Sequence, residues 1–99
     1  MRRDEALRIL RESHGELHKL GVGELYLYGS VARDQAREES DVDLLMEPAD
    51  GRFSIFDLVR VRDFCRKILG TSADIHDYGG FRRLDEFRRR VGGDLIRVF

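Results

Sequence analysis

Apolar residues recur every three or four positions in two long stretches of the chain, which predicts two amphipathic helices. The first helix covers residues 3–20 and the second covers residues 55–69, with Gly21 and Gly70 following them as C-terminal caps. A shorter pattern of the same kind predicts a last helix over residues 84–91. These helices would supply the layer that covers a sheet.

Short apolar runs between polar turns predict the strands of that sheet. Residues 24–28 carry apolar and aromatic side chains on both faces, which favours a strand buried on both sides. Residues 41–46 and 72–76 predict two further strands, and residues 95–99 predict a short final one. Residues 31–38 predict a helix between the first two strands, so that these three elements would form a unit like a β-α-β crossover.

The predicted order of elements is αβαβαβα(β), which indicates a small α/β (α+β) domain with a mixed sheet flanked by helices. The chain has 99 residues, enough for one hydrophobic core and too few for two. We therefore expect residues 1–99 to form a single domain.

Charge and composition narrow the classes of function. Charged residues make up 37% of the chain and nearly cancel, to a net charge of −1, so no basic field would attract nucleic acid. No apolar run reaches the roughly 20 residues of a membrane span, and charges in the first dozen residues exclude a secretory segment. The lone cysteine, Cys65, fits a reducing compartment, so we expect a cytoplasmic protein.

The segment from Tyr28 to Met46 carries the candidate chemistry, and its first half suits a phosphate. A Gly29-Ser30 turn stands between an apolar strand and a helix start. Glycine lets the backbone approach a phosphate closely, and the unpaired N–H groups of a helix start would donate to it together with the Ser30 hydroxyl. Arg33 lies one turn further and could reach the same phosphates. A plain turn with a solvated Arg33 would give the same pattern, so both interpretations stay open.

The second half of the segment suits a divalent metal. Asp41 and Asp43 are two positions apart, so their side chains project from one face of the predicted strand. Carboxylates together with substrate phosphates are the usual ligands of Mg²⁺, and paired ions are typical of phosphoryl transfer. A third carboxylate would come from a neighbouring strand, with Asp74 as the candidate and Asp77 as the alternative. A solvated strand face would show the same pair of aspartates.

The two halves together resemble a known family signature. Gly29-Ser30-x-x-Arg33 followed by Ser40-Asp41-x-Asp43 resembles the motif of the DNA polymerase beta-like nucleotidyltransferase superfamily, and most closely its minimal branch. The resemblance extends from the first predicted strand to the last helix. It implies the nucleotidyltransferase fold and an enzyme that uses ATP as substrate with two Mg²⁺ ions.

The same resemblance implies roles for individual residues. The nucleotide would be bound by Gly29, Ser30, Arg33 and Ser40. The metal ligands and catalytic residues would be Asp41, Asp43 and Asp74, the last of which helps to deprotonate the acceptor hydroxyl.

Two features depart from the family pattern. Asp34 stands where the family often has glycine, and it would add negative charge near the phosphates. His76 would share the face of Asp74 in a segment that is less apolar than usual.

The resemblance also suggests a partner. The minimal branch is typically encoded beside a helical HEPN-domain protein, and the pair resembles a toxin–antitoxin system. The chain would then be a nucleotidyltransferase that acts as antitoxin by transferring AMP to a tyrosine of the toxin, since too few residues remain here for an acceptor pocket. One alternative is a catalytically weak subunit of the same fold that neutralises or scaffolds its partner by binding alone. Another is transfer to a small molecule, which the missing acceptor domain disfavours. Self-association is left open.

Overall fold

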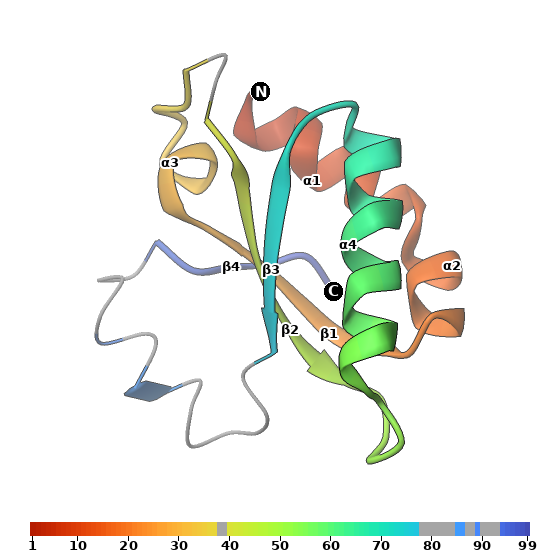
Figure 1. The fold of residues 1–99 in the computed structure, drawn as a ribbon. Helices are drawn as coiled ribbons and strands as arrows, with labels where there is room; N and C mark the ends of the chain where they lie inside the picture. The colour runs from red at the N-terminus through yellow and green to blue at the C-terminus, as the bar shows by residue number, and fades with distance from the viewer. Residues whose placement is uncertain (38–39, 78–84, 87–88, 90–93) are drawn as a thin grey trace.

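The structure is a computed structural model that describes residues 1–37, 40–77, 85–86, 89 and 94–99. Its elements are α1 (Arg3–Glu12), α2 (His14–Lys19), β1 (Val22–Tyr28), α3 (Gly29–Ala32), β2 (Val42–Pro48), α4 (Ile55–Leu69), β3 (Ala73–Asp77) and β4 (Ile96–Arg97). Within the described residues the strands form one sheet in the order β3-β2-β1-β4 (Figure 1). β2 and β3 are parallel, whereas β1 is antiparallel to both β2 and β4. The mixed sheet flanked by helices that the sequence predicts is therefore confirmed.

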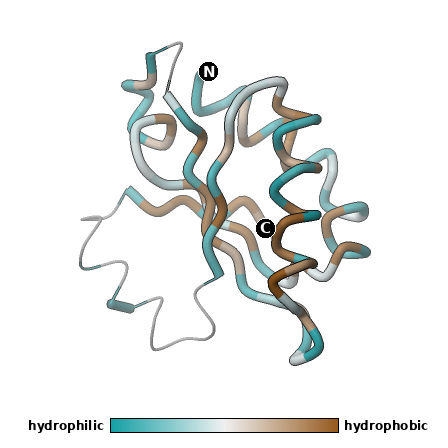
Figure 2. Tube along the Cα trace, in the orientation of Figure 1, coloured by the Kyte–Doolittle hydropathy of each residue, from teal (hydrophilic) through white to brown (hydrophobic). Residues whose placement is uncertain are grey.

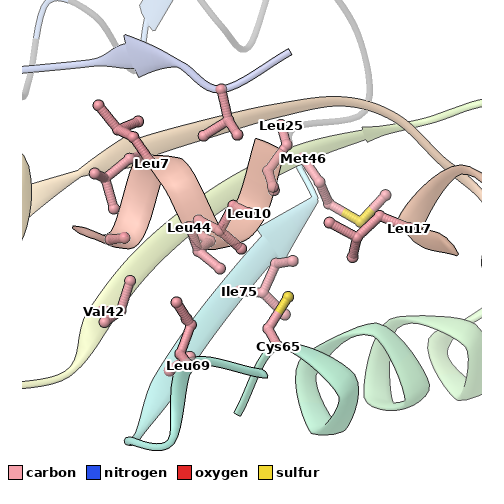
Figure 3. Packing of buried hydrophobic residues seen from close by; sticks show 14 of the residues in the cluster. Leu7, Leu10, Leu17, Leu25, Val42, Leu44, Met46, Cys65, Leu69 and Ile75 are labelled. Carbon is pink, nitrogen blue, oxygen red and sulfur yellow. The ribbon is translucent and has the colours of Figure 1, made fainter. Parts of the chain in front are cut away.

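The hydrophobic core lies between one face of the sheet and three helices. α1, α2 and α4 all lie on that side, and the apolar positions gather along the crossing strands in the centre (Figures 1 and 2). Leu25 of β1 and Leu44 of β2 are fully buried there, and Leu10 of α1 packs against the same cluster (Figure 3). A smaller cluster on the opposite face contains Tyr26 and Leu45. The helices thus cover one face of the sheet, and this small cluster occupies part of the other.

Helix α4 is the connection between the parallel strands β2 and β3, and its local signals explain both of its ends. The Ser54 hydroxyl accepts a hydrogen bond from the Asp57 N–H (3.3 Å), and the Asp57 carboxylate accepts one from the Ser54 N–H (2.8 Å), which is a capping box. Gly70 ends the helix with φ +68°. The predicted bounds are confirmed. Cys65 lies on the buried side, where burial raises the pKa of its thiol to about 12.

The connection between β1 and β2 differs from the prediction. The expected helix over residues 31–38 begins at Gly29 and ends at Ala32, a single turn. That single turn rises only about 6 Å, which is too little to carry the chain back along the roughly 23 Å of β1 to start a parallel neighbour. β2 instead starts beside the end of β1 and runs antiparallel to it, so the expected β-α-β unit is wrong.

Smaller differences concern the ends of elements. The helix predicted over residues 3–20 is interrupted at Ser13 and becomes α1 and α2. Each strand moves by one to a few residues, and the final strand is only Ile96–Arg97. The predicted helix over residues 84–91 lies largely outside the described residues. None of the helices in the described part of the chain is long and apolar enough to cross a membrane.

Candidate active site

Strand register places three side chains in one row across the sheet. Asp43 of β2 lies opposite Tyr28 of β1, and it is also the register partner of Asp74 in β3. Side chains at directly opposite positions share a face, with Cβ atoms about 4.5–5.5 Å apart. The alternate residues Leu44 and Ile75 are buried against the helices, so the row lies on the opposite face of the sheet. The sequence-based expectation that Asp74 would stand beside Asp43 matches this placement.

The Gly29 turn contacts this row directly. Gly29 has φ +76°, and a Cβ atom built on it would collide with Oδ2 of Asp43. The absence of a side chain therefore lets the backbone lie against the carboxylate. The predicted phosphate half and the predicted metal half of the motif are in contact in the folded chain.

Helix α3 is too short to contribute much of a dipole to that turn. The helix has only four residues, Gly29–Ala32. The N–H of the next residue, Arg33, donates a hydrogen bond to the Gly29 carbonyl (3.1 Å). The first N–H groups of any helical turn lack partners within the turn. A phosphate at Gly29 and Ser30 would therefore be held by those N–H groups and the Ser30 hydroxyl.

Arg33 is paired with a residue that the sequence analysis did not single out. Its Nη1 lies 3.0 Å from Oδ2 of Asp94, next to the C-terminal strand, and both side chains are partly exposed. Its charge nevertheless lowers the pKa of Asp43, so the guanidinium lies within electrostatic range of the row. No local pattern links positions so far apart, which is why the pair had no sequence signal.

Asp34 is bound to the start of helix α1. It has φ +59°, and its Oδ1 accepts a hydrogen bond from the N–H of Arg3 (3.1 Å) at the start of α1. The preceding N-cap residue, Arg2, gives α1 no side-chain hydrogen bond, so Asp34 supplies one from elsewhere in the chain. The left-handed φ explains why glycine suits this position, and the contact with α1 explains the aspartate found here.

Ser40 is engaged in a local contact just before β2. Its hydroxyl accepts a hydrogen bond from the Arg37 N–H (3.0 Å), and its own N–H donates to the Arg37 carbonyl (3.0 Å). These bonds position the chain immediately before Asp41, whose side chain is exposed. A direct contact of Ser40 with the nucleotide stays a prediction.

The negative charges of the neighbouring carboxylates in this row repel one another. Burial raises the pKa of Asp43, and the charges of Asp74 and then Asp41 raise it further, while His76 and Arg33 lower it. Burial together with Asp43 and Asp74 raises the pKa of Tyr28 to about 12, so its hydroxyl keeps its proton near neutral pH. A cation bound between these carboxylates would relieve their repulsion.

The donor set suits Mg²⁺ only if the substrate completes it. Among the described residues, no group of three or more His, Cys, Asp or Glu side chains is arranged to hold a metal ion. Mg²⁺ is usually held by one or two carboxylates, waters and substrate phosphates. Asp43 and Asp74 in register, with Asp41 directly before β2, supply hard oxygen donors of that kind.

His76 and Asp77, which follow Ile75 in β3, project from opposite faces of the sheet. His76 stays on the face of Asp74, with Nε2 3.2 Å from Oδ2 of that aspartate. Asp77 alternates to the other side and pairs in register with Met46, although it and His76 both line the surface hollow beside Ile55. Of the two candidates for the third carboxylate, Asp74 is therefore the one in the row.

Comparisons with known proteins agree with this arrangement. Residues 7–96 match the family model of the nucleotidyltransferase domain. A Methanocaldococcus jannaschii protein, named provisionally as a protein adenylyltransferase, is 37% identical over 82 residues, which cover 83% of this chain and 85% of that protein. A solved structure described provisionally as a minimal nucleotidyltransferase has a TM-score of 0.73 and 33% identity, over 97% of this chain and 95% of that one. The fold expected from the sequence motif is thereby confirmed.

Two more distant structures share the fold. A toxin–antitoxin structure with AMP-PNP has a TM-score of 0.65 at 15% identity and covers 100% of this chain and 73% of that one. A mutant of the toxin–antitoxin pair MntA-HpeT has a TM-score of 0.64 at 15% identity and covers 90% of this chain and 71% of that one.

Proposed function

Because this chain belongs to the nucleotidyltransferase domain family, we propose that it transfers AMP from ATP to a hydroxyl group of a partner protein. The 37% identical relative, named provisionally as a protein adenylyltransferase, supports a protein acceptor. The shared fold of a toxin–antitoxin structure with AMP-PNP, an ATP analogue, supports ATP and a toxin as partner. We further propose that the toxin is a HEPN-domain protein, that its acceptor is a tyrosine, and that the pair acts in the cytoplasm.

The observation that carries the proposal is the contact between the Gly29 turn and the row of carboxylates. In a nucleotidyl transfer, the charge of the triphosphate must be bound and its α-phosphorus held next to the acceptor oxygen. N–H groups beside Gly29 and the Ser30 hydroxyl would bind the phosphates, with Arg33 joining them if it leaves Asp94. Asp43 lies against Gly29, so the same short segment reaches both the phosphates and the metal-binding oxygens.

Mg²⁺ held by Asp41, Asp43 and Asp74 would neutralise phosphate charge and polarise the α-phosphorus. Asp74 would accept the proton of the acceptor hydroxyl as that oxygen forms its bond to the α-phosphorus. The bond from the α-phosphorus to the bridging oxygen breaks, and pyrophosphate leaves. His76, 3.2 Å from Asp74, would keep that carboxylate oriented.

A transfer assay with ATP labelled at the α-phosphate tests this function. Incubation with a HEPN-domain toxin should put the label on the toxin, whereas label at the γ-phosphate should leave with pyrophosphate. Asp43→Asn and Asp74→Asn should each reduce the rate at least about 100-fold, as expected when a group that stabilises transition-state charge is removed. Asp77→Asn is the matched control and should retain the rate, because Asp77 lies outside the row.

Two outcomes would contradict the proposal. Equal neutralisation of the toxin by Asp43→Asn with no label transferred would favour a subunit that acts by binding alone. Label that appears only on a small-molecule hydroxyl would favour a different acceptor class.

A further inference from the structure

The outer face of α4 carries an apolar patch that the fold does not use. Ile55, Phe56 and Val59 are 67%, 74% and 40% exposed, and they are the large hydrophobic residues that stand exposed in the described part of the chain. Val59 is four residues after Ile55 and three after Phe56, so it is a surface neighbour of both and joins the three into one patch on the first two turns. A hollow of about 290 Å³ opens beside them, walled partly by Phe53 and Leu58. We call the three exposed residues the α4 patch.

Charges of opposite sign lie on the two sides of the α4 patch. Towards the end of the helix there are four cations and one carboxylate: Arg60, Arg62, Arg66, Lys67 and Asp63. Before the helix and beside it stand the exposed carboxylates of Asp50 and Asp77, with Arg52 as the cation of the same loop. The surface therefore runs from acidic through apolar to basic along the helix.

We propose that the α4 patch is the dimer interface of this chain, with two α4 helices packed antiparallel about a two-fold axis through the patch. In that arrangement the basic end of each helix lies over the acidic end of its copy, and the contact occurs twice by symmetry. A parallel arrangement would place like charges together. The partner that complements this charge order is thus a second copy of the same surface.

The size of the α4 patch sets the expected strength. Because the two-fold axis passes through the first two turns of α4, the two helices overlap over only about 11 Å, and such a contact buries much less than the ~800 Å² per partner of standard stable interfaces. The dimer should be weak and reversible, with a Kd of about 10–100 µM. α4 covers the face of the sheet opposite the Asp43–Asp74 row, so the dimer would leave both rows uncovered. It would border each row at His76, which also lines the hollow beside the patch and lies 3.2 Å from Asp74.

Sedimentation velocity from about 1 µM to 1 mM of the full chain tests the dimer. A reversible monomer–dimer equilibrium is expected, and higher salt should weaken it because the end-to-end contacts are screened. Phe56→Ser should raise the Kd at least about tenfold. Its circular-dichroism melt should match the wild type because the side chain is 74% exposed. Arg8→Ser, an exposed change on α1, is the control and should leave the Kd unchanged.

A charge-swap pair tests the antiparallel order. Lys67→Glu alone and Asp50→Lys alone should each weaken self-association, since each puts like charges together at both ends of its dimer. An equimolar mixture should restore association as a heterodimer, because both of its end contacts are then between opposite charges. A monomer at every concentration, or a dimer indifferent to Phe56→Ser, would overturn the interface. A mixture no stronger than the single variants would overturn the antiparallel arrangement. None of these readouts involves ATP, so they stand apart from the proposed transferase activity.

Discussion

At the scale of single residues, the site depends on an atom that is missing. Gly29 has no Cβ, and the space where one would stand holds the Asp43 carboxylate. Gly70 also has a left-handed φ, +68°, but a Cβ there would meet nothing within 4 Å. Substituting each glycine in turn therefore separates the free-energy cost of the left-handed backbone from the effect of displacing Asp43.

Gly29→Ala should abolish nucleotide transfer, whereas Gly70→Ala should only reduce stability. An L-residue in the left-handed region costs about 1–2 kcal/mol, which lowers the Tm by roughly 4–15 °C for a chain of this size. Both substitutions carry that cost, and Gly29→Ala also pushes Asp43 out of the row. Thermal melts and the transfer assay measure the two effects. Transfer by Gly29→Ala at the rate of Gly70→Ala would show that the contact with Asp43 is dispensable.

The residues of the candidate site could be read from the sequence, but their other contacts could not. Motif spacing and strand alternation were enough to single out Gly29, Asp43 and Asp74. The contacts of Asp34 with Arg3 and of Arg33 with Asp94 join distant segments, and no local pattern encodes them. Such contacts depend on how the helices and the C-terminal strand meet.

At the scale of elements, helix signals were reliable where caps reinforced the apolar period. α4 has a capping box and a left-handed glycine, and both of its ends were predicted correctly. The segment over residues 31–38 contains good helix formers, yet its helix ends at Ala32. Asp34 takes a left-handed conformation to reach α1, which is incompatible with continuing the turn. A tertiary contact thus overrides a local preference.

Ser54→Ala should lower the Tm by about 3–8 °C, because it removes an N-cap that typically contributes around 1 kcal/mol. Ser13→Ala is the matched control, since Ser13 precedes α2 without a side-chain cap bond, and it should change the Tm little. Hydrogen bonding from the Ser54 backbone lowers the pKa of Asp57, so the box is intact above the ordinary carboxyl pKa. The capping box is lost as pH falls through the lowered pKa that Asp57 has in the folded chain. Of the two bonds to the Asp57 carboxylate, Ser54→Ala keeps the one from the backbone N–H and loses only the one from the Ser54 hydroxyl (3.1 Å), so the difference between its melt and that of the wild type should shrink only partly in acid. A Tm equal to that of the wild type at neutral pH would contradict the capping role.

At the scale of the whole molecule, the carboxylate row lowers the stability of the folded chain. Asp43 has a raised pKa because burial and two neighbouring carboxylates disfavour its charge. The folded chain therefore holds this proton more tightly than the unfolded chain does. The resulting loss of stability is absent well below the ordinary pKa of 3.8 and complete once pH exceeds the raised value.

Asp43→Asn should consequently melt about 2–5 °C above the wild type at neutral pH without metal. The difference should vanish as pH falls towards the ordinary carboxyl pKa. Added Mg²⁺ should raise the wild-type Tm by binding the folded state and should affect Asp43→Asn much less. Differential scanning calorimetry across pH, with and without Mg²⁺, measures both effects. A strongly destabilised Asp43→Asn would instead assign the carboxylate a structural role.

The pairing of Asp43 with Asp74 also bears on how faithfully the chain folds. β2 and β3 are parallel and meet only after α4 has crossed between them, so their register is fixed late and without a tight turn to guide it. A slip by one residue would turn Asp74 into the apolar core and bring Ile75 to the face of the row. Burying an unpaired carboxylate is costly enough to reject that pairing. Asp74, whatever its part in the proposed reaction, thus also disfavours the wrong pairing of β2 with β3, and replacing it with a hydrophobic residue would remove the penalty that keeps misregistered chains rare.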